Sequence, residues 1–114
     1  MVRKYTFFMH VNATKDWLSL PREARSEFSR DVLGEIYGHY PSISVRYYDA
    51  EAFSSSCSDI IVYETEIIRD YYFMMDELRD SPLFTVPYIE VVDIIPAIED
   101  GYLEFDEAEA GSLA

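Results

Sequence analysis

The chain has 114 residues, of which 49% are hydrophobic and 16% aromatic, which is the length and apolar content of one globular domain. Its formal charge is −13, from 22 acidic and 9 basic residues. It therefore lacks the basic face that nucleic acids and anionic membrane surfaces require, and we expect neither as a partner. Its single cysteine excludes an internal disulfide and a metal site made of several cysteines.

The N-terminus, Met1-Val2-Arg3-Lys4, has the basic start of a signal peptide. The apolar stretch that follows is short and is not followed by a small-residue cleavage site. No apolar run approaches the roughly 20 residues that span a bilayer. We therefore expect a cytoplasmic protein.

Residues 4–12 predict the first strand. The odd positions from Tyr5 to Val11 are all apolar, whereas the even positions are mixed and include Phe8 and His10. Two such different faces indicate that helices cover the odd face and that the even face is covered less completely.

Two helices and three more strands are predicted after it. Pro21 suits the first turn of a helix, where its missing N–H costs nothing, and apolar residues at every fourth position extend this helix to residue 39. Alternation predicts strands near 43–49, 59–65 and 87–95, with Pro96 ending the last one, and a second apolar stripe predicts a helix near 66–80.

The order β-α-β-β-α-β is that of the α+β, ferredoxin-like fold. It predicts one domain over residues 1–106, with a four-stranded antiparallel sheet in the spatial order 4-1-3-2 and both helices on one face. Residues 107–114 are expected to form a flexible, acidic tail.

The other face of such a sheet is uncovered, and we expect it to carry Phe8 and some of Tyr48, Tyr63 or Tyr88. A second copy could pair with this face. We therefore expect a two-fold homodimer of the dimeric α/β barrel type, which encloses a cavity.

Several segments resemble the darcynin family of small bacterial proteins. They are DAEAF at 49–53, CSD at 57–59, ET at 64–65, YYF at 71–73, LRDSP at 78–82, and, most specifically, PYIEVVDIIP at 87–96 running into IEDGY at 98–102. The resemblance implies a bacterial protein and is compatible with a dimeric α/β barrel, but it brings no established activity. That wider architecture hosts cofactor-free monooxygenases, polyketide cyclases, haem enzymes and stress-response proteins, so fold alone does not choose among them.

His10 is the leading candidate for catalysis, because the usual pKa of histidine suits proton transfer near neutral pH. Glu90 and Asp93 interrupt an apolar strand, and a buried carboxylate could serve as a general acid or base. Strict alternation puts these two acids on opposite faces unless a bulge intervenes, so only one of them should share a face with His10. The alternatives are a histidine bonded within the sheet or at a dimer contact, and carboxylates in salt bridges or in solvent.

Four residues are candidate ligand contacts: Arg46, Tyr48, Tyr63 and Tyr72. An arginine among phenols could orient a carboxylate, enolate or phenolate, and tyrosines could line an aromatic pocket. The alternatives are an edge-strand arginine in solvent and tyrosines in the core or in an interface. Two histidines without short spacing predict no metal site, and no phosphate loop or nucleotide fingerprint predicts a cofactor.

Three functions remain open from the sequence. The first is a cofactor-free cyclase, isomerase or monooxygenase acting on an aromatic or polyketide-like molecule, with a cavity that holds His10 and an acid. The second is a protein that binds a small apolar or aromatic ligand without catalysis, in a cavity without titratable groups. The third is a structural or partner-binding dimer with a filled interface.

Overall fold

The computed structural model describes residues 3–113, with side chains through Gly111. In chain order the elements are β1 (Tyr5–Ala13), α1 (Lys15–Leu18), α2 (Arg22–Phe28), the π-helical turn η1 (Ser29–Leu33), α3 (Gly34–Gly38), β2 (Ser44–Asp49), β3 (Asp59–Thr65), α4 (Ile68–Asp80), α5 (Pro82–Thr85), β4 (Ile89–Ile98) and α6 (Gly101–Leu113).

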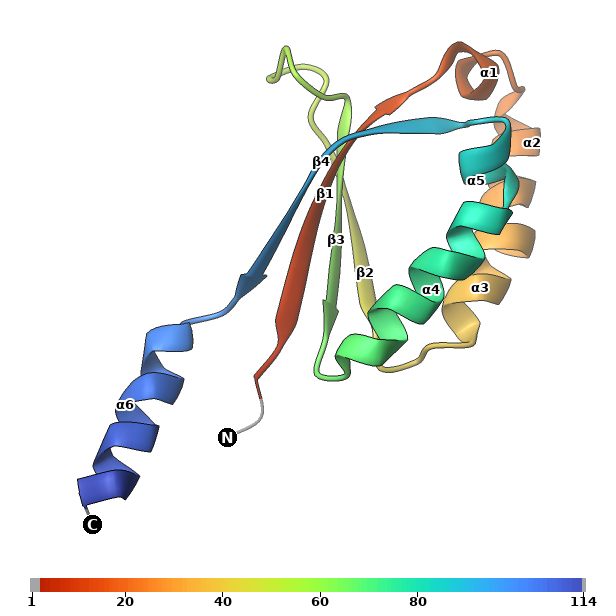
Figure 1. The fold of residues 1–114 in the computed structure, drawn as a ribbon. Coiled ribbons are helices and arrows are strands. Elements are labelled where there is room, and N and C mark those ends of the chain that lie inside the picture. Colours follow the sequence, from red (N-terminus) through yellow and green to blue (C-terminus); the bar gives the residue numbers. More distant parts are fainter. Residues whose placement is uncertain (1–2, 114) are drawn as a thin grey trace.

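The four strands form one antiparallel sheet in the order β2-β3-β1-β4. This is the predicted order read from the other edge. Helices α2 to α4 lie along one face of the sheet, and the other face carries no helix (Figure 1). The predicted α+β, ferredoxin-like fold is therefore confirmed.

The core lies between the sheet and the helices. Phe7, Met9 and Val11 are all buried on the helix side of β1, and they meet Met74 and Leu78 of α4, both of which are fully buried. The odd-numbered face of β1 is thus the covered one, as the alternation predicts. Each buried side chain of this size stabilises the fold by roughly 1.5–3 kcal/mol relative to an exposed one.

The opposite, open face has side chains in rows across the strands. Cross-strand pairing aligns one row as Arg46, Val62, Phe8 and Ile95, and the next row as Tyr48, Ile60, His10 and Asp93. Phe8 and Tyr48 therefore lie on the open face, as expected. Tyr63 and Tyr88 do not, because both pack on the helix side.

Two elements run differently from their prediction. Strand β4 continues through Pro96 to Ile98, whereas Pro96 was expected to end it. This is possible because β4 is an edge strand, where a missing N–H need not break the ladder. The predicted helix over 21–39 is divided by η1 into α2 and α3.

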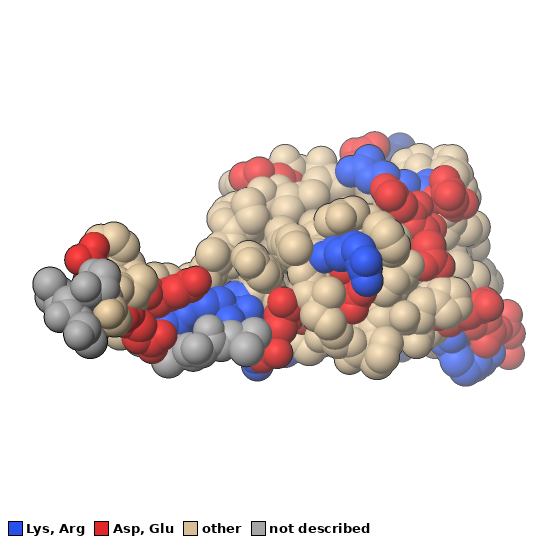
Figure 2. Space-filling view, turned by 60° about the horizontal axis from the view of Figure 1, so that its bottom comes forward, with Lys and Arg blue, Asp and Glu red and all other residues tan. Residues whose placement is uncertain are grey.

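Helix α6 extends away from the rest of the molecule (Figure 1). Arg3 lies beside it, with its guanidinium 3.6 Å from Glu104 and 3.6 Å from Glu107. Figure 2 shows acidic and basic side chains together where this arm leaves the body. The sequence by itself predicts no helix here, because the segment has no apolar stripe to bury. The flexibility expected from residue 107 onward stays a prediction.

We predict that Leu78→Ala lowers the free energy of unfolding by about 2–5 kcal/mol, because it removes a fully buried side chain and leaves a cavity. The matched change Leu18→Ala removes the same atoms from a side chain that is 59% exposed, and should cost at most about 0.5 kcal/mol. Urea unfolding followed by circular dichroism measures both losses. Equal losses in the two variants would contradict the position of Leu78 in the core.

Candidate functional site

A pocket of about 480 Å³ lies between the sheet and the segment formed by η1 and α3. We call it the helix-side pocket. Most of its lining is apolar: Val11, Ala13, Trp17, Leu33, Val45, Ile61, Leu83 and Ile89, with polar groups from Ser29, Tyr37, Tyr47 and Asp59. Binding sites for small molecules commonly have this composition, in which apolar walls enclose a few polar groups.

The π-helical turn η1 forms one wall of this pocket. Its first and last residues, Ser29 and Leu33, both line the space, as does the following residue, Gly34. A Cβ atom at Gly34 would lie 3.5 Å from the backbone oxygen of Ser29, which is ordinary van der Waals contact. Glycine is therefore not forced here by the backbone, and it leaves space beside the pocket. Turns of this kind are frequent at functional sites.

Trp17 is held at one end of the pocket by contacts distant in sequence. Thr14 caps α1 by accepting a hydrogen bond from the Trp17 backbone N–H at 3.3 Å, and its own hydroxyl donates to the Pro87 carbonyl at 2.7 Å. The Trp17 ring packs against Phe28 and Tyr88, with centroids 5.8 and 5.4 Å away. These three rings join α1, α2 and the start of β4 beside the pocket.

Three tyrosine hydroxyls are hydrogen-bonded in a chain at this pocket. The Tyr47 hydroxyl donates to the Tyr37 hydroxyl at 3.0 Å, and the Tyr37 and Tyr63 hydroxyls are 3.0 Å apart. Burial raises the pKa of each of the three phenols well above its ordinary value. All three are therefore neutral at physiological pH, and can donate hydrogen bonds.

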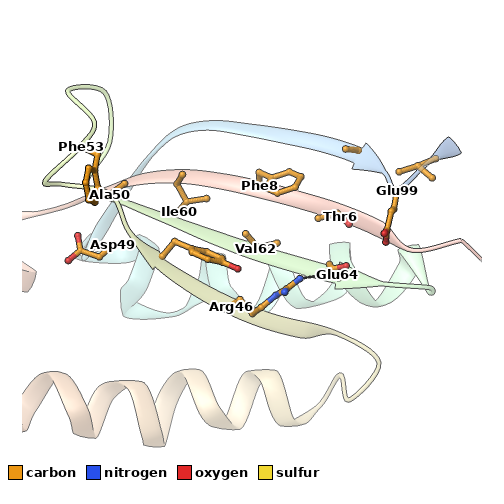
Figure 3. Close-up of a pocket in the computed structure, with 13 residues that line it drawn as sticks. Thr6, Phe8, Arg46, Asp49, Ala50, Phe53, Ile60, Val62, Glu64 and Glu99 are labelled. Carbon is orange, nitrogen blue, oxygen red and sulfur yellow. Dashed lines mark hydrogen bonds and ion pairs between the residues drawn. The ribbon is translucent and has the colours of Figure 1, made fainter. Parts of the chain in front are cut away.

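The open face has its own hollow, of about 620 Å³ (Figure 3). We call it the open-face hollow. Arg46 reaches across its floor to an ion pair with Glu64, whose side chain is mostly covered. Phe8 and Tyr48 line it, and Phe53 approaches from the loop between β2 and β3. The hollow therefore combines apolar side chains with the ion-paired Arg46 and Glu64 and with further polar groups from Thr6, Asp49 and Glu99.

His10 lies on the open face, outside both hollows. A bulge in β4 shifts the register between His10 and Val11, so His10 pairs with Asp93 while Asn12 pairs with Glu90. Because paired residues share a face, both acids lie on the same side as His10. The expectation that only one does so is wrong, and the extra residue in β4 is the reason.

No side-chain hydrogen bond or ion pair joins His10 to either acid within residues 3–113. Asp93 instead accepts a hydrogen bond from the Ile94 backbone N–H at 2.9 Å. A catalytic role for His10 with Asp93 or Glu90 stays a prediction.

The four predicted ligand contacts are divided among three places. Arg46 and Tyr48 lie together in the open-face hollow. Tyr63 is fully buried on the other side of the sheet, and Tyr72 lies half-exposed on the outer side of α4 against Phe73. Alternation along β3 and β2 separates Tyr63 from Tyr48, so these residues do not form one site.

Four pocket residues are not among those predicted from the sequence: Trp17, Tyr37, Tyr47 and Asp59. Tyr47 could have been found, since alternation in β2 places it opposite Arg46 and Tyr48, on the covered face. No local signal marks Trp17 or Asp59. Their position depends on the packing of segments far apart in the chain.

In the part of the chain that the structure describes, no three histidine, cysteine, aspartate or glutamate side chains gather closely enough to hold a metal ion. Within the same residues, no helix has both the length and the apolar character needed to cross a bilayer.

Comparison with solved structures shows which fold this chain shares. Two solved structures of chlorite dismutase from Candidatus Nitrospira defluvii, a mutant and a complex with imidazole, match with TM-scores of 0.67 and 0.68 at 17% identity. Each match covers 83% of this chain but only 39% of the chlorite dismutase chain, so this chain spans about two fifths of that protein. The likeness shows a ferredoxin-like fold of the chlorite dismutase type.

Sequence comparison shows the family. The model of the Darcynin family, described as a domain of unknown function, matches residues 2–112. The chain is 56% identical to Darcynin 1 of Acinetobacter baumannii over 89 residues, which are 78% of this chain and 99% of the relative. It is 37% identical to a Darcynin homolog of Streptomyces avermitilis over 98 residues, which are 85% of this chain and 80% of the relative. The protein belongs to the Darcynin family, and the resemblance seen in its sequence is confirmed.

A second polar cluster joins the end of α3 to α4, outside both hollows. His39, the C-terminal cap of α3, lies with its Nδ1 2.8 Å from the Glu77 carboxylate, and the Tyr40 hydroxyl donates to the same carboxylate. The hydrogen bond from Tyr40 and the contact with His39 lower the pKa of Glu77. The same hydrogen bond raises the pKa of Tyr40 to about 12.

We predict that Tyr40→Phe reduces the loss of stability at alkaline pH. The folded protein holds the Tyr40 proton more tightly than the unfolded chain, in which tyrosine titrates near about pH 10. The stabilisation of the folded state by the Tyr40 hydrogen bond is therefore complete below about pH 10, and it is lost as the pH rises toward about 12. Urea unfolding of wild type and variant at several pH values measures the difference, with Tyr72→Phe as the control. A difference that stays constant with pH would contradict the assignment.

Proposed function

We propose that this protein binds a small apolar or aromatic molecule in the helix-side pocket, and that it acts as a homodimer formed through the open sheet faces. The observation that carries the proposal is the pocket itself. It offers about 480 Å³ between two layers of the fold, with an apolar lining and two hydrogen-bonded phenols, Tyr37 and Tyr47. A space of this size suits a molecule of one or two rings.

The helix-side pocket is a better candidate than the open-face hollow for two reasons. It lies between two layers, so a ligand would lose contact with water on opposite sides, which is the main source of apolar affinity. Arg46, the one cation among the described residues that line the open-face hollow, is also already engaged, because it forms an ion pair with Glu64. The phenols of the helix-side pocket retain hydrogen-bonding capacity.

Binding without catalysis is favoured over an enzyme by the residues that line this pocket. They include no histidine, and the raised pKa values of Tyr37 and Tyr47 keep both phenols protonated. His10 lies on the opposite face of the sheet and could not act on a molecule held there. The Asp59 carboxylate is the one described lining group that could accept a proton, and it already accepts a hydrogen bond from the Ser58 hydroxyl.

The homodimer is supported by the apolar character of the open face. Phe8 is 37% exposed, Ile95 44% and Phe53 92%, which leaves large apolar side chains in water over a continuous face. Pairing two such faces would bury them in a two-fold interface. His10 and Asp93 would then lie at or near the contact between the two copies.

We predict that Gly34→Leu weakens binding in the helix-side pocket about tenfold or more, because the new side chain fills space needed by the ligand. The probe is 2-ethylnaphthalene, and the signal is the indole N–H peak of Trp17, the single tryptophan of the chain. Gly38→Leu is the matched control, since a Cβ at Gly38 meets nothing within 4 Å and this residue does not line the pocket. Equal affinity in both variants would show that the probe binds elsewhere.

We predict that Ile95→Glu makes the protein monomeric at micromolar concentration, because a carboxylate in a dry interface is costly to desolvate. Tyr72→Glu adds the same charge to a comparably exposed residue on the outer side of α4, and should leave the dimer intact. Sedimentation velocity distinguishes the two states. A wild-type protein that sediments as a monomer would remove the proposed interface altogether.

A further inference from the structure

The three hydrogen-bonded tyrosines have three hydroxyl protons, but only two hydrogen bonds join their oxygens. Tyr47, Tyr37 and Tyr63 each carry one hydroxyl proton, and two hydrogen bonds join the three oxygens. Two of these protons are therefore donated to another tyrosine of the cluster, and the third must point elsewhere. Among the described residues, no further hydrogen bond joins any of the three hydroxyls to another acceptor.

The position of the spare proton follows from burial. Tyr63 is fully buried, and leaving its proton without an acceptor would carry the desolvation penalty of an unpaired polar group. This penalty favours Tyr63 as the donor in its hydrogen bond with Tyr37, whose oxygen also accepts the hydrogen bond from Tyr47. The hydroxyl that remains free to donate is that of Tyr37, which lines the helix-side pocket.

The carboxylate of Asp59 affects which ligand charges the helix-side pocket accepts. Asp59 lines the same space and accepts a hydrogen bond from the Ser58 hydroxyl at 2.7 Å. No lysine or arginine is among the lining residues, and the whole chain carries a formal charge of −13. An anionic ligand would thus meet repulsion without a compensating cation.

We propose that the helix-side pocket selects a neutral aromatic molecule that carries a carbonyl oxygen, and that the Tyr37 hydroxyl donates a hydrogen bond to that oxygen. This inference rests on the proposed function, since it specifies the ligand of the same pocket. An apolar ligand that displaces water from Tyr37 without supplying an acceptor leaves the phenol proton unpaired, and this is the source of the selectivity.

Three probes of closely matched shape test the proposal: 2-acetylnaphthalene with a carbonyl, 2-ethylnaphthalene without one, and the anion 2-naphthoate. Each is titrated into the ¹⁵N-labelled full-length chain while the Trp17 indole peak is followed. The ketone and the hydrocarbon lose different amounts of hydration on binding. Each probe is therefore compared between proteins rather than with the other probe.

The decisive variant is Tyr37→Phe, which removes one oxygen and keeps the ring. We expect it to weaken binding of 2-acetylnaphthalene about tenfold and to leave binding of 2-ethylnaphthalene unchanged within about twofold. Tyr63→Phe is the matched control, because it removes a hydroxyl from the same chain at a residue that does not line the pocket. It should leave the affinity for the ketone within about twofold.

The outcomes separate the two proposals. If none of the probes shifts the Trp17 peak of the wild type, the proposed function itself is wrong. If the naphthalenes bind but Tyr37→Phe affects the ketone and the hydrocarbon alike, the pocket binds ligands and the role of the Tyr37 hydroxyl is refuted. An equal loss in Tyr63→Phe would refute the assignment of the spare proton to Tyr37. Binding of 2-naphthoate as tight as that of the ketone would refute the selection for neutral molecules.

Discussion

The burial of one face of β1 is the constraint on which the rest of the structure depends. Phe7, Met9 and Val11 can leave water only if both long helices pack on the same side of the sheet. That packing leaves the opposite face without a cover, because residues 3–113 contain no third long helix except α6, which extends away from the sheet. The pocket on one side and the exposed apolar face on the other are thus two results of a single burial pattern.

The helix-side pocket lies where this packing is least complete. The turn η1 interrupts the regular helix, and Gly34 adds no side chain beside it. Tyrosines enter the space from α3 and β2, and their hydroxyls bond to one another rather than to the backbone. Apolar side chains ordinarily fill the layer between a sheet and its helices, because unfilled space loses dispersion energy. The presence of linked phenols beside open space is the feature that most suggests a ligand.

The bulge in β4 shows how one inserted residue changes what a sequence pattern means. Glu90 and Asp93 are three positions apart, so regular alternation separates them, yet both lie on the face of His10. The open face therefore carries more acidic charge than alternation implies. In the proposed dimer, His10 and these acids of both copies would share one environment.

The sequence by itself determined the order of the long elements, the buried face of β1 and the family, because hydrophobic alternation and local motifs report on burial within a few residues. It also placed Arg46 and Tyr48 on one face. Only the tertiary structure decided the bulge in β4, the π-helical turn, the extension of β4 through Pro96, and the meeting of Trp17, Tyr37, Tyr47 and Asp59 around one pocket. These features depend on contacts between residues distant in the chain, and the free energy of those contacts has no local signature in the sequence.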